Sequence, residues 1–286
     1  MKSNSGSDRG KIPFALSMWM LAPVIVLTTV IFLYPVCRLL LTSFFDPSFT
    51  LANYYKLATQ RLYTTVLLRT LWISAATTIT CIILGYPVAV LMTKTRGIWT
   101  AVVTSCVLIP LWTSVLVRSY AWTVLLQRNG LINQFLLKVG IIDRPLTLIY
   151  TEGSLLIAMA HVLLPFMILP IYSALRNISP DLSKAGANLG AGRSRIFWSI
   201  TLPLSMSGVF AGCVIVFILA LGFYVTPALV GGPRTMMIAT LIGQQVNELL
   251  NWPLAGAISL VLLVVALTIT LLFRRFAGVD KVTAHV

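Results

Sequence analysis

Long apolar segments are the feature that most constrains this fold. We find six, at roughly residues 13–42, 66–93, 98–126, 152–175, 204–226 and 253–275. Each is at least about 20 residues long, which is what an α-helix needs to cross the hydrocarbon core of a bilayer. Only 10% of the residues are charged, whereas a soluble domain carries about 25%. The sequence therefore predicts an all-α integral membrane protein with about six transmembrane helices.

The chain divides into one membrane domain and two tails. We predict an N-terminal tail at 1–12, a transmembrane domain at 13–276 and a C-terminal tail at 277–286. The first apolar segment is longer than the core of a signal peptide, which spans about 7–15 residues, and no small-residue cleavage site ends it. It is interpreted as an uncleaved first helix. The outer loops at 127–151 and 227–252 each have a pattern that favours a short helix, although a packed loop explains 127–151 equally well.

The distribution of Lys and Arg predicts the orientation. A formal net charge of +14 would suggest nucleic acid as a partner of a soluble protein, but here the basic residues flank apolar segments. They concentrate in both tails, at Lys94 and Arg96, and between residues 176 and 195. We therefore expect both termini and residues 179–203 on the cytoplasmic side of the membrane, in contact with lipid and not with nucleic acid. The four cysteines lie in apolar stretches without metal-ligand spacing, so we expect no metal site.

One stretch interrupts the apolar pattern, "SKAGANLGAGRSRIFWSITLP" at 183–203. Just before it, Ser179 is a good N-cap, Pro180 suits the first helical position, and Asp181 suits the positive end of the helix dipole. Leu182, Ala185 and Leu189 then share one helical face. The pattern predicts a short amphipathic helix lying on the membrane surface.

Glycines punctuate this stretch. Gly190 is well placed to end the helix, and a second short helix is expected after Gly192, with Pro203 marking the entry to the fifth span. Gly186 and Gly190 form a G-x-x-x-G pattern, which predicts that another surface approaches the backbone closely.

The same stretch resembles the EAA motif of ABC importer permeases, in which Glu-Ala-Ala is followed by Gly and then Ile-x-Leu-Pro. The spacing fits throughout, but Lys replaces the Glu and Gly replaces the second Ala. The matching residues are Lys184, Ala185, Gly186, Gly190, Ile200, Leu202 and Pro203. The resemblance covers roughly residues 15–275, and "RSYAWTVLLQRNGLIN" at 118–133 resembles the third-helix region of spermidine/putrescine-type permeases.

This resemblance implies a type I ABC importer permease fold with a cytoplasmic coupling helix. Its implied partners are two copies of an ATP-binding subunit, a second permease subunit and a periplasmic substrate-binding protein. It also implies that ATP and Mg²⁺ are used by the ATP-binding subunits, so this chain is expected to be a transport subunit without a catalytic site or cofactor. The coupling region, 179–203, would dock on those subunits through Asp181, Leu182, Lys184, Ala185, Gly186, Leu189, Gly190, Ile200, Leu202 and Pro203.

Residues of the translocation path are harder to identify. Aromatic faces bind ammonium groups, so the candidates are Trp112, Tyr120, Trp122 and Tyr224. Arg118 is a further candidate, because a charge within the membrane is costly and is usually functional or paired. Packing and membrane-interface belts explain the aromatic residues equally well, and Arg118 could instead extend to the headgroups. We expect the latter for Arg69, and hydrogen-bonded packing for His161.

The expected function is the import of polyamines or related small organic amines. One alternative is an ABC permease for another small solute, such as an amino-acid-like compound, an opine or a phosphonate. A second alternative is an ion-coupled secondary transporter, which would use paired carboxylates within the membrane or inverted repeats. The sequence offers neither feature, since Asp46, Asp143, Glu152 and Glu248 lie in or beside the outer loops. The chain also lacks the spacing of a phosphate-binding loop.

Overall fold

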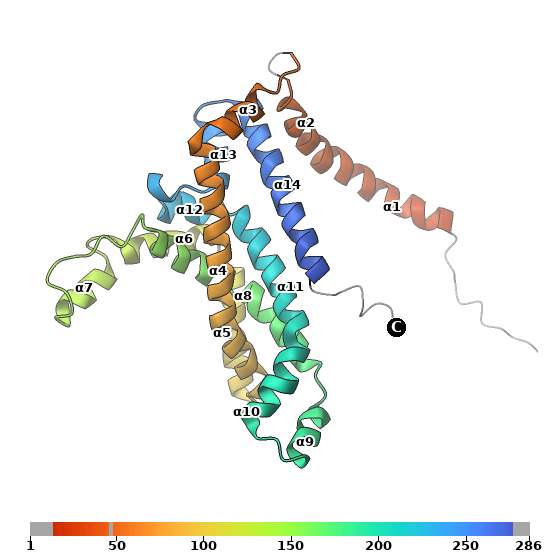
Figure 1. The fold of residues 1–286 in the computed structure, drawn as a ribbon, viewed down its shortest axis with the longest axis vertical. Helices are drawn as coiled ribbons and strands as arrows, with labels where there is room; N and C mark the ends of the chain where they lie inside the picture. The colour runs from red at the N-terminus through yellow and green to blue at the C-terminus, as the bar shows by residue number, and fades with distance from the viewer. Residues whose placement is uncertain (1–13, 46–47, 277–286) are drawn as a thin grey trace, which may run out of the picture.

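The computed structural model describes residues 14–45 and 48–276, and most of this part is helical. The helices at 61–94, 152–176, 202–221 and 252–276 run side by side in an elongated bundle, whereas the helix at 14–42 extends away from it (Figure 1). This arrangement confirms the predicted all-α architecture. The tails predicted at 1–12 and 277–286, and Asp46, lie outside the described residues.

Within the described residues, five helical stretches are long and apolar enough to cross a membrane, and a bent pair raises the number to six. The first is formed by α1 (Phe14–Thr28), the π-helical turn η1 (Thr29–Leu33) and α2 (Tyr34–Thr42). The others are α4 (Arg61–Lys94), α8 (Glu152–Arg176), the helix that ends with α11 (Leu202–Leu221), and α14 (Trp252–Phe276). These helices agree with five of the six predicted segments to within a few residues at most ends.

The third predicted segment, 98–126, is not one continuous helix. Helix α5 (Ile98–Trp112) and the helices that begin with α6 (Val115–Leu126) are bent by 100° at residues 113 and 114. The Thr113 hydroxyl donates to the Pro110 carbonyl at 2.9 Å, and this is the carbonyl that the Ser114 N–H would need if the helix continued. Thr113 and Ser114 instead adopt extended backbone conformations. A side chain that competes for a backbone carbonyl thus ends α5.

The fifth predicted segment, 204–226, is wrong at its C-terminal end. Helix α11 ends at Leu221, with Gly222 as its C-cap, and α12 (Val225–Val230) begins a separate short helix. Tyr224 is the N-cap of α12. It therefore lies in the connection at the end of the span and not within it.

Helices α4, α8 and α11 form the packed core. Their contact depends on glycines of α11, because a methyl group added to Gly208 would lie 2.6 Å from both the Ala174 Cβ and the Pro170 carbonyl oxygen of α8. The same addition at Gly212 would lie 2.6 Å from the Met167 Sδ. Gly208 and Gly212 therefore form a helix-packing face, as their spacing predicts.

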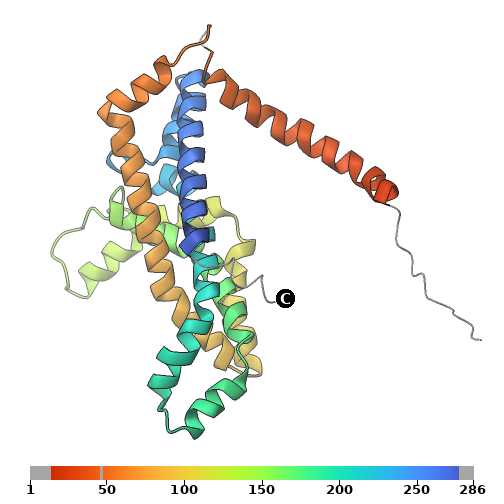
Figure 2. The ribbon, with the colours of Figure 1, turned by 45° about the vertical axis from the view of Figure 1, so that its right-hand side comes forward.

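Several shorter helices lie toward the end of the bundle opposite α9 (Figures 1 and 2). They include α3 (Ala52–Thr59), the 3-10 turn η3 (Pro233–Thr235) and α13 (Ile238–Asn247). Helix α7 (Leu131–Lys138) extends sideways with α6 as an arm. Helices α7 and α13 confirm the short helices predicted in the two outer loops.

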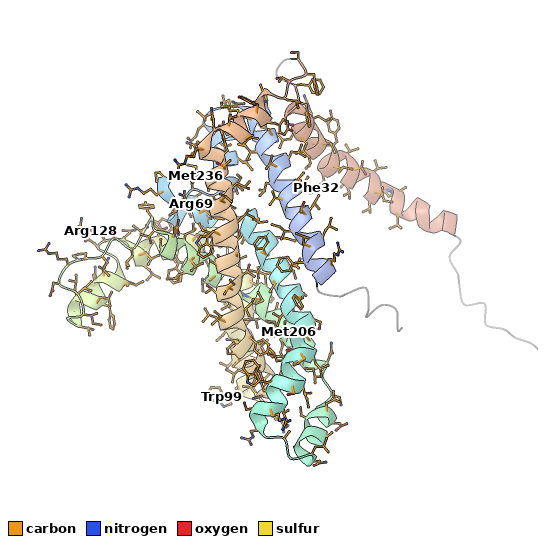
Figure 3. All side chains as sticks on the ribbon, in the orientation of Figure 1. Phe32, Arg69, Trp99, Arg128, Met206 and Met236 are labelled. Atoms are coloured by element: carbon orange, nitrogen blue, oxygen red, sulfur yellow. The ribbon has the colours of Figure 1, made fainter. Side chains whose placement is uncertain are left out.

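Arg69, which we expected to extend to the headgroups, forms an ion pair between helices. Its Nε lies 3.7 Å from the Glu152 Oε1 at the start of α8. Figure 3 labels Arg69 on α4, away from the end of the bundle where Trp99 lies. The guanidinium therefore pairs with a neighbouring helix.

Candidate functional site

The coupling region begins with helix α9 (Pro180–Asn188), whose start agrees with the sequence prediction. Ser179 is the N-cap, and its hydroxyl accepts a hydrogen bond from the Asp181 backbone N–H at 3.3 Å. Pro180 occupies the first helical position. These contacts satisfy one of the donors that a helix start leaves free and fix the direction in which α9 leaves α8.

The end of α9 depends on a left-handed residue. Gly190 has a φ of 82°, and its N–H donates to the Ala187 carbonyl at 3.0 Å. The Ala191 N–H reaches back to the Gly186 carbonyl at 3.0 Å. This pair of bonds is a Schellman motif, which satisfies two of the last carbonyls and turns the chain sharply.

The second helix is longer than predicted. It begins with α10 (Arg193–Ile196), passes through the π-helical turn η2 (Phe197–Thr201) and continues without a break into α11. The Leu202 N–H bonds to the Phe197 carbonyl, five residues back. The wider turn lies directly before Pro203, which has no N–H of its own, so the helix continues past the proline. Leu202 and Pro203 thus belong to the spanning helix.

Gly186 lies where α9 contacts this second helix. It is buried, and a methyl group there would lie 3.1 Å from the Ile200 Cδ1 and 3.4 Å from the Ile196 Cγ1. The close approach predicted from the G-x-x-x-G pattern at this position is therefore to the chain itself. Two motif positions, Gly186 and Ile200, hold α9 and the second helix together as one hairpin.

Beside the buried Gly186, α9 also carries an exposed apolar face. Leu182 is 46% exposed and Leu189 is 88% exposed, and Ala185 lies on the same exposed side. Lys184, also exposed, forms an ion pair with Asp181 at 2.9 Å within the helix. An apolar face flanked by a balanced pair of charges is suited to contact with another protein surface.

The predicted path residues lie on different elements. Trp112 is 90% exposed at the end of α5, before the 100° bend, and Tyr120 on α6 is 60% exposed. The Arg118 Nη1 lies 3.5 Å from the Val162 carbonyl of α8. Trp122 donates from Nε1 to the His161 Nδ1 at 3.2 Å, so the hydrogen bond expected for His161 is present. Arg118 and Trp122 thus both join α6 to α8.

Tyr224 belongs to a neighbouring group. Helices α6 and α12 are joined by a 2.7 Å hydrogen bond between the hydroxyls of Ser119 and Thr226. The ring of Tyr224 packs across Gly243 of α13, where an added methyl group would lie 2.5 Å from the Tyr224 Cε2. Tyr224 is 46% exposed and lines a hollow of about 330 Å³ between α12 and α13.

Sequence reasoning missed the polar residues that line this hollow with Tyr224. The Gln244 Nε2 donates to the Glu248 Oε2 at 3.1 Å, and Thr240 and Asn247 also line the hollow. Their spacing, at i, i+4, i+7 and i+8, places them on one face of a helix. This polar stripe on the short helix expected in the outer loop was the signal available in the sequence.

Comparison with known proteins gives consistent matches. The model of the family described as "binding-protein-dependent transport system inner membrane component" matches residues 81–279. The spermidine/putrescine transport system permease protein PotB of Escherichia coli K12 is 34% identical over 233 residues, covering 82% of this chain and 84% of PotB. The inner membrane ABC transporter permease protein YdcU of the same organism is 34% identical over 246 residues, covering 82% and 78%.

A solved structure extends the likeness to the fold. It shows a bacterial alginate ABC transporter in complex with an alginate pentasaccharide-bound periplasmic protein. The matching chain has a TM-score of 0.76 at 20% identity, covering 92% of this chain and 96% of that chain. At this identity the comparison shows the fold alone.

Proposed function

Since the chain belongs to the binding-protein-dependent transport system inner membrane components, we propose that it forms, with a second permease, the membrane path for polyamines or related small organic amines. It is the permease subunit of an ABC importer, a multi-pass protein of the inner membrane with the type I fold. Homologous importers work with ATP-binding subunits and a periplasmic binding protein, and the ATPase is a separate chain. The identity with PotB over 82% of this chain is the observation that supports the substrate class.

The hollow beside Tyr224 supports an amine substrate. Its lining residues combine an aromatic ring, the Glu248 carboxylate and the amides of Gln244 and Asn247. Among the described residues, no Lys or Arg lines it. A carboxylate and an aromatic face both attract an ammonium group, and amide oxygens accept its hydrogen bonds. Each contact with an aromatic face is worth only about 0.5–2 kcal/mol, which is weak enough to release a moving substrate.

The second part of the proposal concerns coupling. We assign the exposed face of α9 as the docking surface for an ATP-binding subunit, with two copies of that subunit in the complex. Basic residues gather at this end of the bundle: Lys94 ends α4, Arg96 follows it, and Arg193 and Arg195 lie on α10. The positive-inside rule predicts such residues on a cytoplasmic surface. We propose on the same basis that both termini are cytoplasmic.

Uptake by the reconstituted transporter tests the substrate class. We expect ATP-dependent accumulation of radiolabelled spermidine or putrescine in the presence of the binding protein. Glu248→Gln should lower the uptake rate several-fold, whereas Asp143→Asn, which removes an exposed outer-loop carboxylate away from the hollow, should not. Transport of an amino-acid-like solute, an opine or a phosphonate in place of both amines would reject the substrate class, and accumulation without ATP would favour an ion-coupled transporter.

A further inference from the structure

A second cavity, of about 390 Å³, lies at the other end of the bundle, beside α9 and α10. Its walls come from the last turns of α4, the connection between α8 and α9, and the first turns of the α10–α11 helix. It shares no residue with the hollow at Tyr224. The proposed function leaves it without a role.

The polar part of this cavity has the chemistry of an anion site. Lys94 and Arg193 both line it, and among the described residues no acidic side chain does. Neither cation forms an ion pair within the described part of the chain. The lining also includes hydroxyl groups, from Thr93, Ser179, Ser183 and Thr201. The Thr93 hydroxyl already donates to the Val90 carbonyl. The ammonium, the guanidinium and the other hydroxyl groups around this space match the several acceptor oxygens of a phosphate group.

The remaining lining is apolar and favours an amphiphile over a free ion. Val90, Leu175, Ile178, Ile196 and Phe197 contribute to the walls. A hydrated inorganic phosphate gains nothing from such a surface, whereas the glycerol and upper acyl carbons of a phospholipid would bury apolar area against it.

The position of the cations also fits a lipid headgroup. Helix α4 has 34 residues and is therefore about 51 Å long, well beyond the hydrocarbon core of about 30 Å. Lys94, its last residue, can thus reach the headgroup layer. Arg193 begins the 29-residue helix that crosses the membrane beside it.

We propose that this cavity binds the phosphate of an anionic phospholipid of the cytoplasmic leaflet. Lys94 and Arg193 hold the phosphate, and the apolar walls hold the first acyl carbons. Because Lys94 ends α4 and Ser183 belongs to α9, the bound lipid bridges a spanning helix and the coupling helix. The assignment to the cytoplasmic leaflet depends on the orientation given in the proposed function. The binding site is inferred from the cavity alone.

Lipid titration of the assembled transporter tests this proposal. Native mass spectrometry would follow the binding of phosphatidylglycerol, with phosphatidylcholine as the neutral comparison. Each basic residue near an anionic surface contributes about five-fold to affinity, so Lys94→Gln and Arg193→Gln should each weaken phosphatidylglycerol binding about five-fold, and the double variant about thirty-fold. The conservative pair Lys94→Arg and Arg193→Lys should retain most of the binding.

Matched controls come from the same surface. Arg96→Gln and Arg195→Gln remove equal charge nearby but outside the cavity lining, and we expect less than a two-fold effect. Equal losses in these controls would show a diffuse surface attraction and overturn the proposal. So would displacement of the lipid by millimolar inorganic phosphate, which would indicate a site for a free anion.

A third outcome would identify the cavity as a protein contact. If the Lys94 and Arg193 variants lose ATP-binding subunits on purification while phosphatidylglycerol binding is unchanged, the proposal fails. The lipid readout does not depend on the transported solute. Normal lipid binding in a transporter that does not import polyamines would therefore reject the proposed substrate and leave the lipid site standing.

Discussion

The left-handed turn at Gly190 gives the sharpest test of the coupling assignment. An added methyl group there would meet nothing within 4 Å, so Gly190→Ala introduces no steric clash. The φ of 82° is nevertheless a conformation that residues with a Cβ rarely adopt. The substitution therefore tests backbone strain alone.

The magnitude follows from the conformation. A non-glycine residue in the left-handed region costs about 1–2 kcal/mol, which corresponds to a factor of about 5–30 in an equilibrium. If docking requires the turn that ends α9, Gly190→Ala should weaken the association with the ATP-binding subunits by up to that factor. Gly190→Asn should recover part of it, because Asn adopts this conformation more readily than Ala.

The assay is the recovery of ATP-binding subunits with the purified permease, together with ATP hydrolysis stimulated by the loaded binding protein. Gly192→Ala is the matched control, because Gly192 has a φ of −67° and an added methyl group would also meet nothing within 4 Å. We expect Gly192→Ala to resemble the parent. Equal recovery and equal stimulation in the Gly190 and Gly192 variants would refute the role of this turn in docking.

Three further predictions concern packing, the path and charge. Gly208→Ala should destabilise the folded permease by about 1–3 kcal/mol in thermal unfolding, since its methyl group would meet the Ala174 Cβ and backbone that cannot yield. Trp122→Phe loses the hydrogen bond to His161, and about 0.5–1.5 kcal/mol of stability with it. If an aromatic face at this position guides the amine, Phe should preserve spermidine uptake and Trp122→Ala should reduce it. Lys184→Ala should leave the recovery of ATP-binding subunits within about two-fold of the parent, because an exposed ion pair contributes only about 0–1 kcal/mol.

Local rules were sufficient where the structure depends on neighbouring residues in the sequence. Ser179, Pro180 and Gly190 predicted the start and end of α9 because caps and left-handed turns involve only a few adjacent residues. The length of the apolar segments predicted most helices of the bundle, because a spanning helix is a continuous stretch of the sequence. The close approach at Gly208 was also predictable, since small residues four apart on one face indicate helix packing.

Features that depend on competing contacts were not predictable. The bend at residues 113 and 114 arises because the Thr113 hydroxyl donates to the Pro110 carbonyl. A hydropathy pattern contains no information about such a hydrogen bond. The pairing of Arg69 with Glu152 joins two helices far apart in sequence. The hollow likewise forms only when α13 folds back beside Tyr224, so that Glu248, assigned to an outer loop from the sequence, becomes part of a candidate site.

Lys184 replaces the Glu of the EAA motif, and the structure shows how its charge is balanced. A Lys in place of the motif Glu would require a compensating anion on the ATP-binding subunit if position 184 acted through its charge. Asp181 already supplies that anion, 2.9 Å away in the same helix, and both groups are exposed. By contrast, Gly186 is buried against Ile200 and Gly190 ends the helix in a conformation that disfavours other residues. Gly190 and Ile200 are motif residues that this chain keeps, and Gly186, which replaces the motif Ala, leaves room for Ile200. These residues fix the shape of the hairpin, so docking should depend on that shape more than on the charge at 184.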